Sequence, residues 1–153
     1  MADSLSRAVA KRVSLGTVTV TGAAGTVKTG STVVNLAKQA LPIQGGILGS
    51  FNGACVVATV STAITGTNTT TNISIMLQGS HDGVAFFNLA PAISAGVQNQ
   101  LTVNASDSPS GAAGQVTSMN FPGPLPQFIR GAALNGAAAS IAGVVTLEAV
   151  VLG

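Results

Sequence analysis

The chain has 153 residues, of which 7% are charged and 46% are hydrophobic, and its formal net charge is +2. Soluble domains carry about 25% charged residues, and charge of one sign keeps molecules apart in solution. So little charge argues against a freely diffusing enzyme, and a body without a basic stripe argues against direct binding of nucleic acid. We therefore expect identical copies or a larger assembly to cover much of the surface.

The length corresponds to one domain, with or without an additional arm. β-branched Val and Thr are frequent, and 19 glycines separate the apolar runs. This composition is typical of an all-β protein. We predict an N-terminal arm over residues 1–15 and a single β-sandwich domain over residues 16–153.

The arm carries half of the basic residues of the chain. Within residues 3–13, the side chains of Leu5, Val9 and Arg12 would fall on one side of a short amphipathic helix. Such a short helix is marginal in isolation, so we expect it to become ordered only against a neighbouring molecule. The candidate contact residues of the arm are Leu5, Arg7, Val9, Lys11 and Arg12.

The period of the apolar residues changes to two after the arm. Residues 17–21 alternate Thr and Val, which predicts a half-buried strand. Further strands are expected over residues 26–36, with a break at Gly30, and over residues 53–63. Residues 37–50 contain proline and several glycines and are predicted to form a loop.

A hairpin is the clearest local signal. Residues 73–78 alternate between apolar and other side chains, and a second apolar run follows at residues 84–87. The dipeptide Asp82-Gly83 lies between these runs, and Asp-Gly in that position is a strong hairpin signal.

The remaining strands are expected over residues 97–104, 115–121, 126–134 and 141–152. A proline-rich connector over residues 122–126 separates two of them. The last strand is almost wholly apolar, so we expect a central position in a sheet or a position at a subunit interface. Eight or nine short strands separated by turns indicate an antiparallel, jelly-roll-like β-sandwich.

No pattern of residues typical of catalysis is present, and we predict no catalytic residues, no metal ligands and no cofactor. The acids are scattered, and His81 is the single histidine; we expect it to be a solvated turn residue. A carboxylate pair formed by Asp82 and Asp107 remains open, as does a calcium site that uses Asp82 or Asn88.

The single cysteine and the phenylalanines have structural interpretations. Cys55 lies in an apolar run and is predicted to be a buried small hydrophobic residue. The absence of Trp and Tyr counts against a sugar-binding platform. Four phenylalanines are predicted to lie in the core, namely Phe86, Phe87, Phe121 and Phe128.

Two segments carry a resemblance to a known family. The sequence ISIMLQGSHDGVAFFNL over residues 73–89 resembles the central hairpin of the small jelly-roll cement (decoration) proteins of tailed bacteriophages. QFIR at residues 127–130, followed by GVVTLEAVVL at residues 143–152, is similar to the closing strands of that group. The pattern Gln-Gly-Ser-x-Asp-Gly also resembles a hairpin of discoidin-type carbohydrate-binding sandwiches, in which an aromatic residue follows; Phe86 and Phe87 follow here.

The resemblance to cement proteins implies a structural virion protein without catalytic residues. Such a protein binds the outer capsid lattice and bridges neighbouring shell subunits. Its partners would be the major capsid protein and further copies of itself, as a trimer, with neither a membrane nor direct nucleic acid. Synthesis would take place in the host cytoplasm, and the location would be the capsid exterior. Arg130 is a candidate interface cation, because arginine forms bidentate pairs with carboxylates.

Two alternatives remain at this point. One is a carbohydrate-binding jelly-roll module on a viral fibre or spike. The other is the shell-forming coat protein itself, although an arm with so few basic residues would contribute little to binding packaged nucleic acid.

Overall fold

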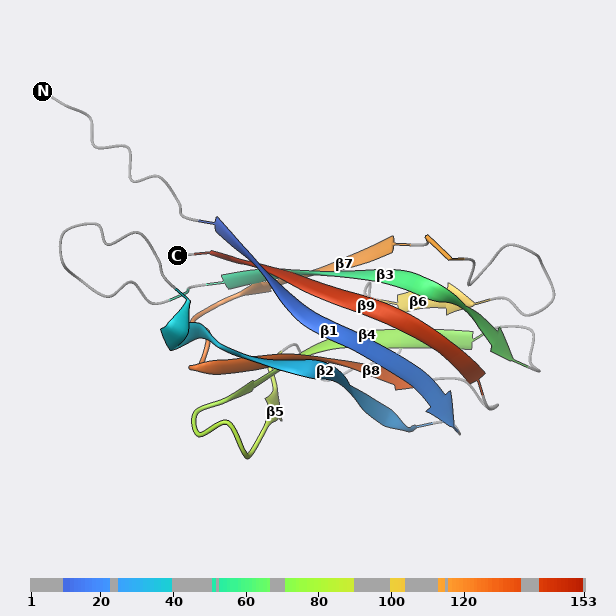
Figure 1. Ribbon diagram of the computed structural model, residues 1–153, viewed down its shortest axis with the longest axis horizontal. Helices are drawn as coiled ribbons and strands as arrows, with labels where there is room; N and C mark the ends of the chain where they lie inside the picture. Colours follow the sequence, from blue (N-terminus) through green and yellow to red (C-terminus); the bar gives the residue numbers. More distant parts are fainter. Residues whose placement is uncertain are drawn as a thin grey trace, which may run out of the picture.

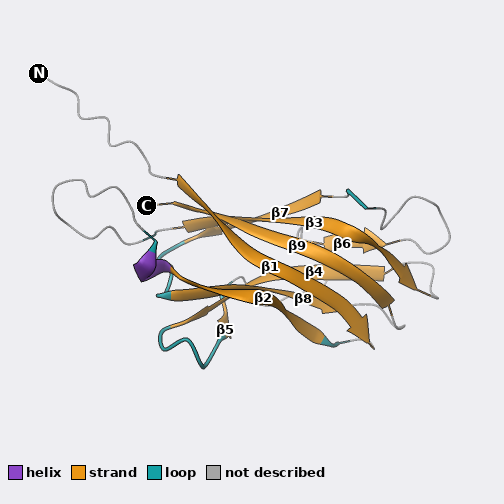
Figure 2. Cartoon of the chain, viewed as in Figure 1, coloured by secondary structure: helices purple, strands orange, loops and turns teal. Residues whose placement is uncertain are grey.

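The fold of the chain is a sandwich of two antiparallel β-sheets (Figures 1 and 2). This confirms the predicted all-β class. The computed structural model describes residues 10–22, 25–39, 51, 53–66, 71–89, 100–103, 113–114, 116–135 and 141–152.

Each sheet contains strands from both halves of the chain. Sheet A has the order β1 (Ala10–Gly22), β9 (Ile141–Leu152), β3 (Gly53–Gly66) and β7 (Val116–Pro122). Sheet B has the order β2 (Val27–Asn35), β8 (Phe128–Asn135) and β4 (Thr71–Ser80). The short strands β5 (Phe87–Asn88) and β6 (Gln100–Val103) both pair with β4. A 3-10 turn, η1 (Leu36–Lys38), follows β2.

The pairing of the strands is nested. β1 pairs with β9, β2 with β8, β3 with β7, and β4 with β5 and β6. The first and second halves of the chain therefore pair with each other like the two strands of a long hairpin, and the two halves pass together from one sheet to the other. Additional pairs between β9 and β3 and between β8 and β4 join the windings into continuous sheets. This strand order is that of a jelly roll, as the strand count predicted.

The core lies between the sheets and is built from alternate residues of the central strands. Val56, Leu147 and Val145 contribute from sheet A, and Ile73 and Ile129 from sheet B; all are fully buried. Alternate side chains of a strand point to opposite faces, so one face of each strand supplies the core. β4 is an exception, because it is buried on both faces from residue 73 to residue 80.

The helix predicted over residues 3–13 is wrong for residues 10–13, which belong to a strand. β1 begins at Ala10, which pairs with Leu152 in the last strand. Val13 is buried while Arg12 is exposed, which is the period of a strand. A long-range strand partner outweighs the weak preference of a short segment for helix. The remaining arm residues Leu5, Arg7 and Val9 lie outside the described residues.

Other local predictions are confirmed with changes of detail. The break expected at Gly30 appears as a register shift of β2 against β8 between residues 29 and 33. The hairpin around Asp82-Gly83 is present, because Gly79 pairs with Phe87 across it. β9 is central in sheet A, between β1 and β3, although its outer face is half-exposed rather than covered.

The core predictions for Cys55 and Phe87 are wrong. Cys55 is only half-buried, because it points to the outer face of β3 while Ala54 and Val56 point inward. Phe87 is 45% exposed and lies on the short β5. Phe121 is half-buried against the core, and Phe86 and Phe128 are half-buried as well.

Candidate functional site

One open side of the sandwich lies between β1 and β2, the edge strands of the two sheets. Midway along this side the strands touch, and the backbone N–H of Thr17 donates to the hydroxyl of Ser31 at 3.1 Å. The registers of both strands shift near this contact. Gly16 has a φ of +79°, and a Cβ there would collide with the Ser31 hydroxyl. Glycine therefore permits both the backbone conformation and the close approach.

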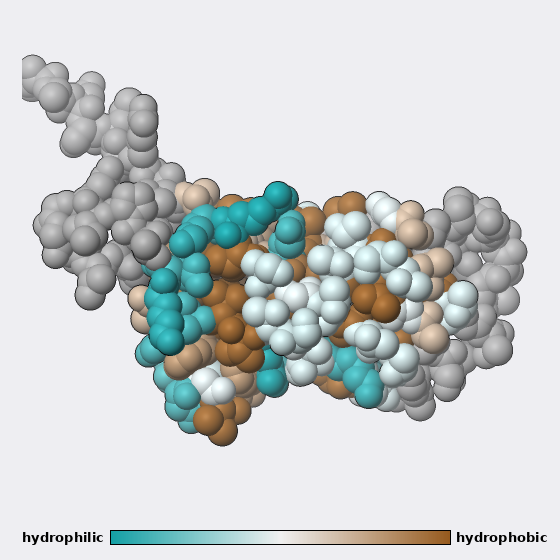
Figure 3. Space-filling model, in the orientation of Figure 1, coloured by the Kyte–Doolittle hydropathy of each residue, from teal (hydrophilic) through white to brown (hydrophobic). Residues whose placement is uncertain are grey.

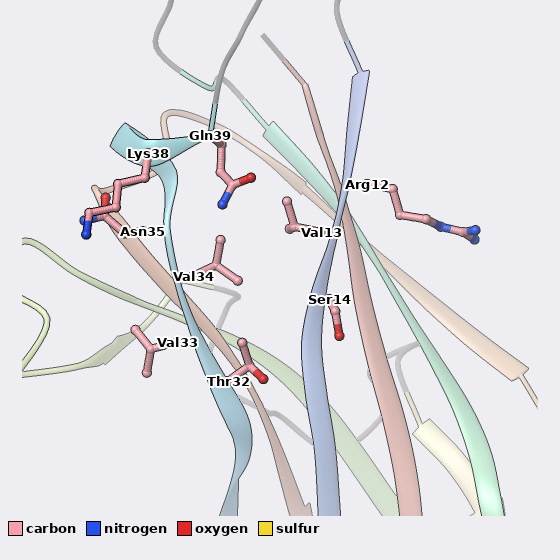
Figure 4. A pocket seen from close by; sticks show the side chains of 9 residues that line it. All are labelled: Arg12, Val13, Ser14, Thr32, Val33, Val34, Asn35, Lys38 and Gln39. Carbon is pink, nitrogen blue, oxygen red and sulfur yellow. The ribbon is translucent and has the colours of Figure 1, made fainter.

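Toward the start of β1 the two strands diverge and leave a groove, which we call the edge groove. Its volume is about 530 Å³. In Figure 4 the side chains of Val13 from β1 and Val34 from β2 point toward each other across it, and they form an apolar floor. The groove is lined by Arg12, Val13, Ser14, Thr32, Val33, Val34, Asn35, Lys38 and Gln39.

The rim of the edge groove is polar and basic. Asn35 ends β2 and caps η1, because its Oδ1 accepts from the backbone N–H of Ala37 at 3.0 Å. This turn places Lys38 on the β2 side of the groove, and Arg12 lies on the β1 side. In Figure 4 both side chains point away from the space between Val13 and Val34. Figure 3 shows the result as a hydrophilic arc around a hydrophobic patch, over the start of β1 and η1.

The charges around the edge groove are not balanced. The described residues include five basic side chains but only two acidic ones, Asp82 and Glu148, and neither acid lines the groove. Glu148 forms an ion pair with Arg12 on the outer face of sheet A, with 3.2 Å between Oε2 and Nη2. The two side chains are 69% and 39% exposed, so the pair contributes at most about 1 kcal/mol. The groove is thus lined by two basic residues, one of them ion-paired, and by no acidic residue.

The outer face of sheet A is almost uncharged. In the strand register, Thr146 lies between Thr17 and Thr59, and Val144 lies between Thr19 and Thr62. Among the described residues, the charged side chains of this face are Arg12 and Glu148, and Glu148 lies beside Val57 in the strand register. We call the uncharged part the threonine–valine face, and its members are Thr17, Thr19, Val57, Thr59, Val144 and Thr146.

The loop between β4 and β5 is held by Asp82. Its Oδ1 accepts from the backbone N–H groups of Val84 at 2.8 Å and Ala85 at 2.9 Å, and from the hydroxyl of Ser80 at 2.8 Å. These hydrogen bonds, that from Val84 first, lower the pKa of Asp82 to about 2. The carboxylate is therefore committed to the turn. His81 beside it is exposed, as predicted.

Arg130 lies in sheet B and fastens the same loop. Its Nε donates to Oε1 of Gln78 at 2.8 Å, and its guanidinium lies 3.9 Å from the centre of the Phe86 ring. Gln78 in turn donates from Nε2 to Oδ1 of Asn88 at 2.9 Å. The structure does not bring Arg130 together with Arg12, because the two belong to different sheets.

The interface residues predicted from the sequence therefore do not lie together in one site. Lys11 and Arg12 lie at the start of β1, beside or in the edge groove, and Arg130 lies elsewhere. Sequence reasoning missed the second wall of the groove, which includes Asn35 and Lys38. An Asn at the end of a strand is a signal for a capped turn, whereas the sequence patterns predict a strand up to residue 36 and a loop from residue 37.

The metal site and the carboxylate pair that the sequence left open are considered next for the described residues. In the part of the chain that the structure describes, no three or more His, Cys, Asp or Glu residues come together in a way that could hold a metal ion. Asp107, the expected partner of Asp82 in a carboxylate pair, lies outside that part. The described residues also contain no helix that is long and apolar enough to cross a membrane.

No protein-family model matches the chain, and no curated protein is significantly similar to it. Two solved structures from infectious bursal disease virus are weakly similar. The VP2 subviral particle aligns with a TM-score of 0.27 and 15% identity, over 99% of this chain and 43% of that chain. The virus-derived T=1 particle aligns with a TM-score of 0.22 and 17% identity, over 99% and 41%. This chain thus spans less than half of either protein, and at these TM-scores neither likeness supports a function.

Proposed function

We propose that this chain is a structural virion protein that binds the outer capsid lattice and stabilises it by bridging neighbouring shell subunits. The observation that carries the proposal is the division of the surface into an uncharged threonine–valine face and an edge groove lined by basic but no acidic residues. In this proposal the partners are the major capsid protein and further copies of the chain, as a trimer, on the capsid exterior.

The two surfaces would have different tasks in such an assembly. The threonine–valine face can be buried at a low desolvation cost, because it contains β-branched and hydroxyl side chains but no charge. The basic rim of the edge groove would orient the contact toward acidic groups of a shell subunit. A protein that binds only the assembled shell stabilises that shell by mass action. No catalytic step is part of this function.

Light scattering of the pure protein, followed by co-sedimentation with shells of the major capsid protein, tests the proposal. We expect an oligomer that binds the preformed shells and raises their melting temperature. Val144→Lys introduces a charge in the middle of the threonine–valine face and should abolish binding. Val84→Lys is the matched control, because Val84 is 84% exposed on the β4–β5 loop, and it should bind normally. A monomer that does not bind shells, or normal binding by Val144→Lys, would contradict the proposal.

A second candidate is a carbohydrate-binding module on a viral fibre or spike. The observation that favours it is an exposed aromatic pair, since Phe87 is 45% exposed and its ring centre lies 5.6 Å from that of His81. Phe86 is not available as a platform, because Arg130 lies over its ring. Binding to a glycan array that is lost in Phe87→Ala but kept in Val33→Ala would support this function. No binding by the wild-type protein would exclude it.

A further inference from the structure

The edge groove combines a free strand edge, an apolar floor and a basic rim. We propose that it binds an extended segment of a partner protein, with alternating apolar and acidic residues, as an additional strand beside β1. This inference deepens the proposed function by naming the chemistry of the partner segment, and it rests on that function only for the identity of the partner as a shell subunit.

The first support is the free backbone edge of β1. One edge of β1 pairs with β9, and no described strand pairs with the other. Alternate N–H and C=O groups of an edge strand point away from the sheet and can pair with an added strand. The N–H of Thr17 is one of these groups, and it donates a hydrogen bond to the hydroxyl of Ser31 on β2. Toward Arg12 the strands have diverged, and the edge groove takes the place of that contact.

The second support is the shape and polarity of the edge groove. It is lined by residues 12–14 of β1 and residues 32–35 of β2. A strand advances about 3.3 Å per residue, so the groove accommodates about three or four residues of extended chain. In an added strand, alternate side chains would point inward over Val13 and Val34, which are 7% and 6% exposed. The inward positions therefore favour apolar side chains.

The third support is charge complementarity. The remaining side chains of an added strand would point outward, toward the rim that carries Arg12 and Lys38. No acidic residue lines the groove, and Glu148 contacts Arg12 from the outer face of sheet A. The outward positions therefore favour Asp or Glu. The apolar floor favours such a peptide over a polyanion without apolar groups, such as a nucleic acid.

The probe is a fluorescein-labelled hexapeptide of alternating Val and Glu, with binding to the pure protein measured by fluorescence anisotropy. We expect saturable binding, and no binding of the matching Val and Lys peptide. Lys38→Glu should weaken binding at least about tenfold. Lys28→Glu, which changes an exposed cation of β2 outside the groove, should leave binding unchanged. Thermal unfolding of both variants establishes that they are folded.

A second pair of probes separates strand addition from simple attraction of charge. In a strand, only alternate N–H groups face the neighbouring strand. Methylation of one alternate set of peptide nitrogens should therefore abolish binding, and methylation of the other set should be tolerated. Equal effects of the two sets, no binding of any peptide, or equally tight binding of an oligothymidylate would overturn the inference. Because shells are absent from this assay, peptide binding without shell binding would refute only the proposed function, and the reverse result would refute only the added strand.

Discussion

Asp82 accepts hydrogen bonds from two backbone N–H groups and from Ser80, all within the loop between β4 and β5. The Asp82-Gly83 pair was sufficient to locate the turn from the sequence, because Asp and Gly are favoured there for local reasons. The sequence could not exclude a catalytic or calcium-binding carboxylate. The loop geometry shows that the oxygen is already used within the turn, and it favours a structural role.

The first prediction concerns the pH dependence of this turn. The pKa of Asp82 is lowered from 3.8 to about 2, so the contribution of its carboxylate to stability is present above about pH 4. That contribution is lost as the pH falls toward 2, when the folded state takes up the proton. We expect Asp82→Asn to unfold at a lower temperature than the wild-type protein at neutral pH, and the difference to shrink between about pH 4 and pH 2.

Differential scanning calorimetry of both proteins across this pH range measures the effect. An NMR titration of the Asp82 carboxyl carbon, with a midpoint near 2, is the independent check. A difference in unfolding temperature that stays constant down to the lowest pH would show that the carboxylate charge does not stabilise the turn.

Among the strands, β9 and β1 show which features an apolar sequence pattern predicts correctly and which it does not. The apolar run of β9 predicted a central position in a sheet or a position at a subunit interface, and β9 does lie between β1 and β3. Its outer face is nevertheless half-exposed. The sequence did not show this, because an apolar run without alternation does not indicate which face of the strand the core covers. In β1, residues 10–13 fit a helix and a strand equally well, and their partner lies at the other end of the sequence.

The second prediction compares two leucines of β9. Leu147 is fully buried and Leu152 is 42% exposed. Leu147→Ala should lower the free energy of unfolding by about 2–5 kcal/mol, because it leaves a cavity between the sheets. Leu152→Ala should change it by about 0.5 kcal/mol. Urea unfolding followed by circular dichroism measures both, and equal effects would mean that the sides of β9 are assigned incorrectly.

For the whole molecule, the nested pairing has a kinetic consequence. β1 pairs with β9 and β2 with β8, so the two ends of the chain must meet before sheet A is complete. Contacts between distant parts of a sequence close large loops, and proteins dominated by them fold slowly. The arrangement also makes the last strand indispensable, since β9 joins β1 to β3.

The third prediction follows from this arrangement. Refolding from urea should take milliseconds to seconds, about the range of all-β sandwiches, when it is followed by stopped-flow fluorescence of an attached dye. A chain that ends after Asn135 lacks β9 and should show no cooperative unfolding transition. A chain shortened only by residues 152–153 is the control and should unfold cooperatively. Cooperative unfolding of the chain without β9 would contradict the central role of that strand.

The all-β class, most strand positions and the turn at Asp82 could be predicted without a structure, because they follow from composition and from periods within a few residues. That residues 12–14 form one wall of a groove and residues 32–35, 38 and 39 the other could not be predicted, because it depends on how the strands are arranged in space. The same is true of the contact between Arg130 and Phe86. Such residues become neighbours because the two halves of the chain pair with each other in the jelly roll. Pairing between distant strands produces no periodic pattern within a short stretch of sequence.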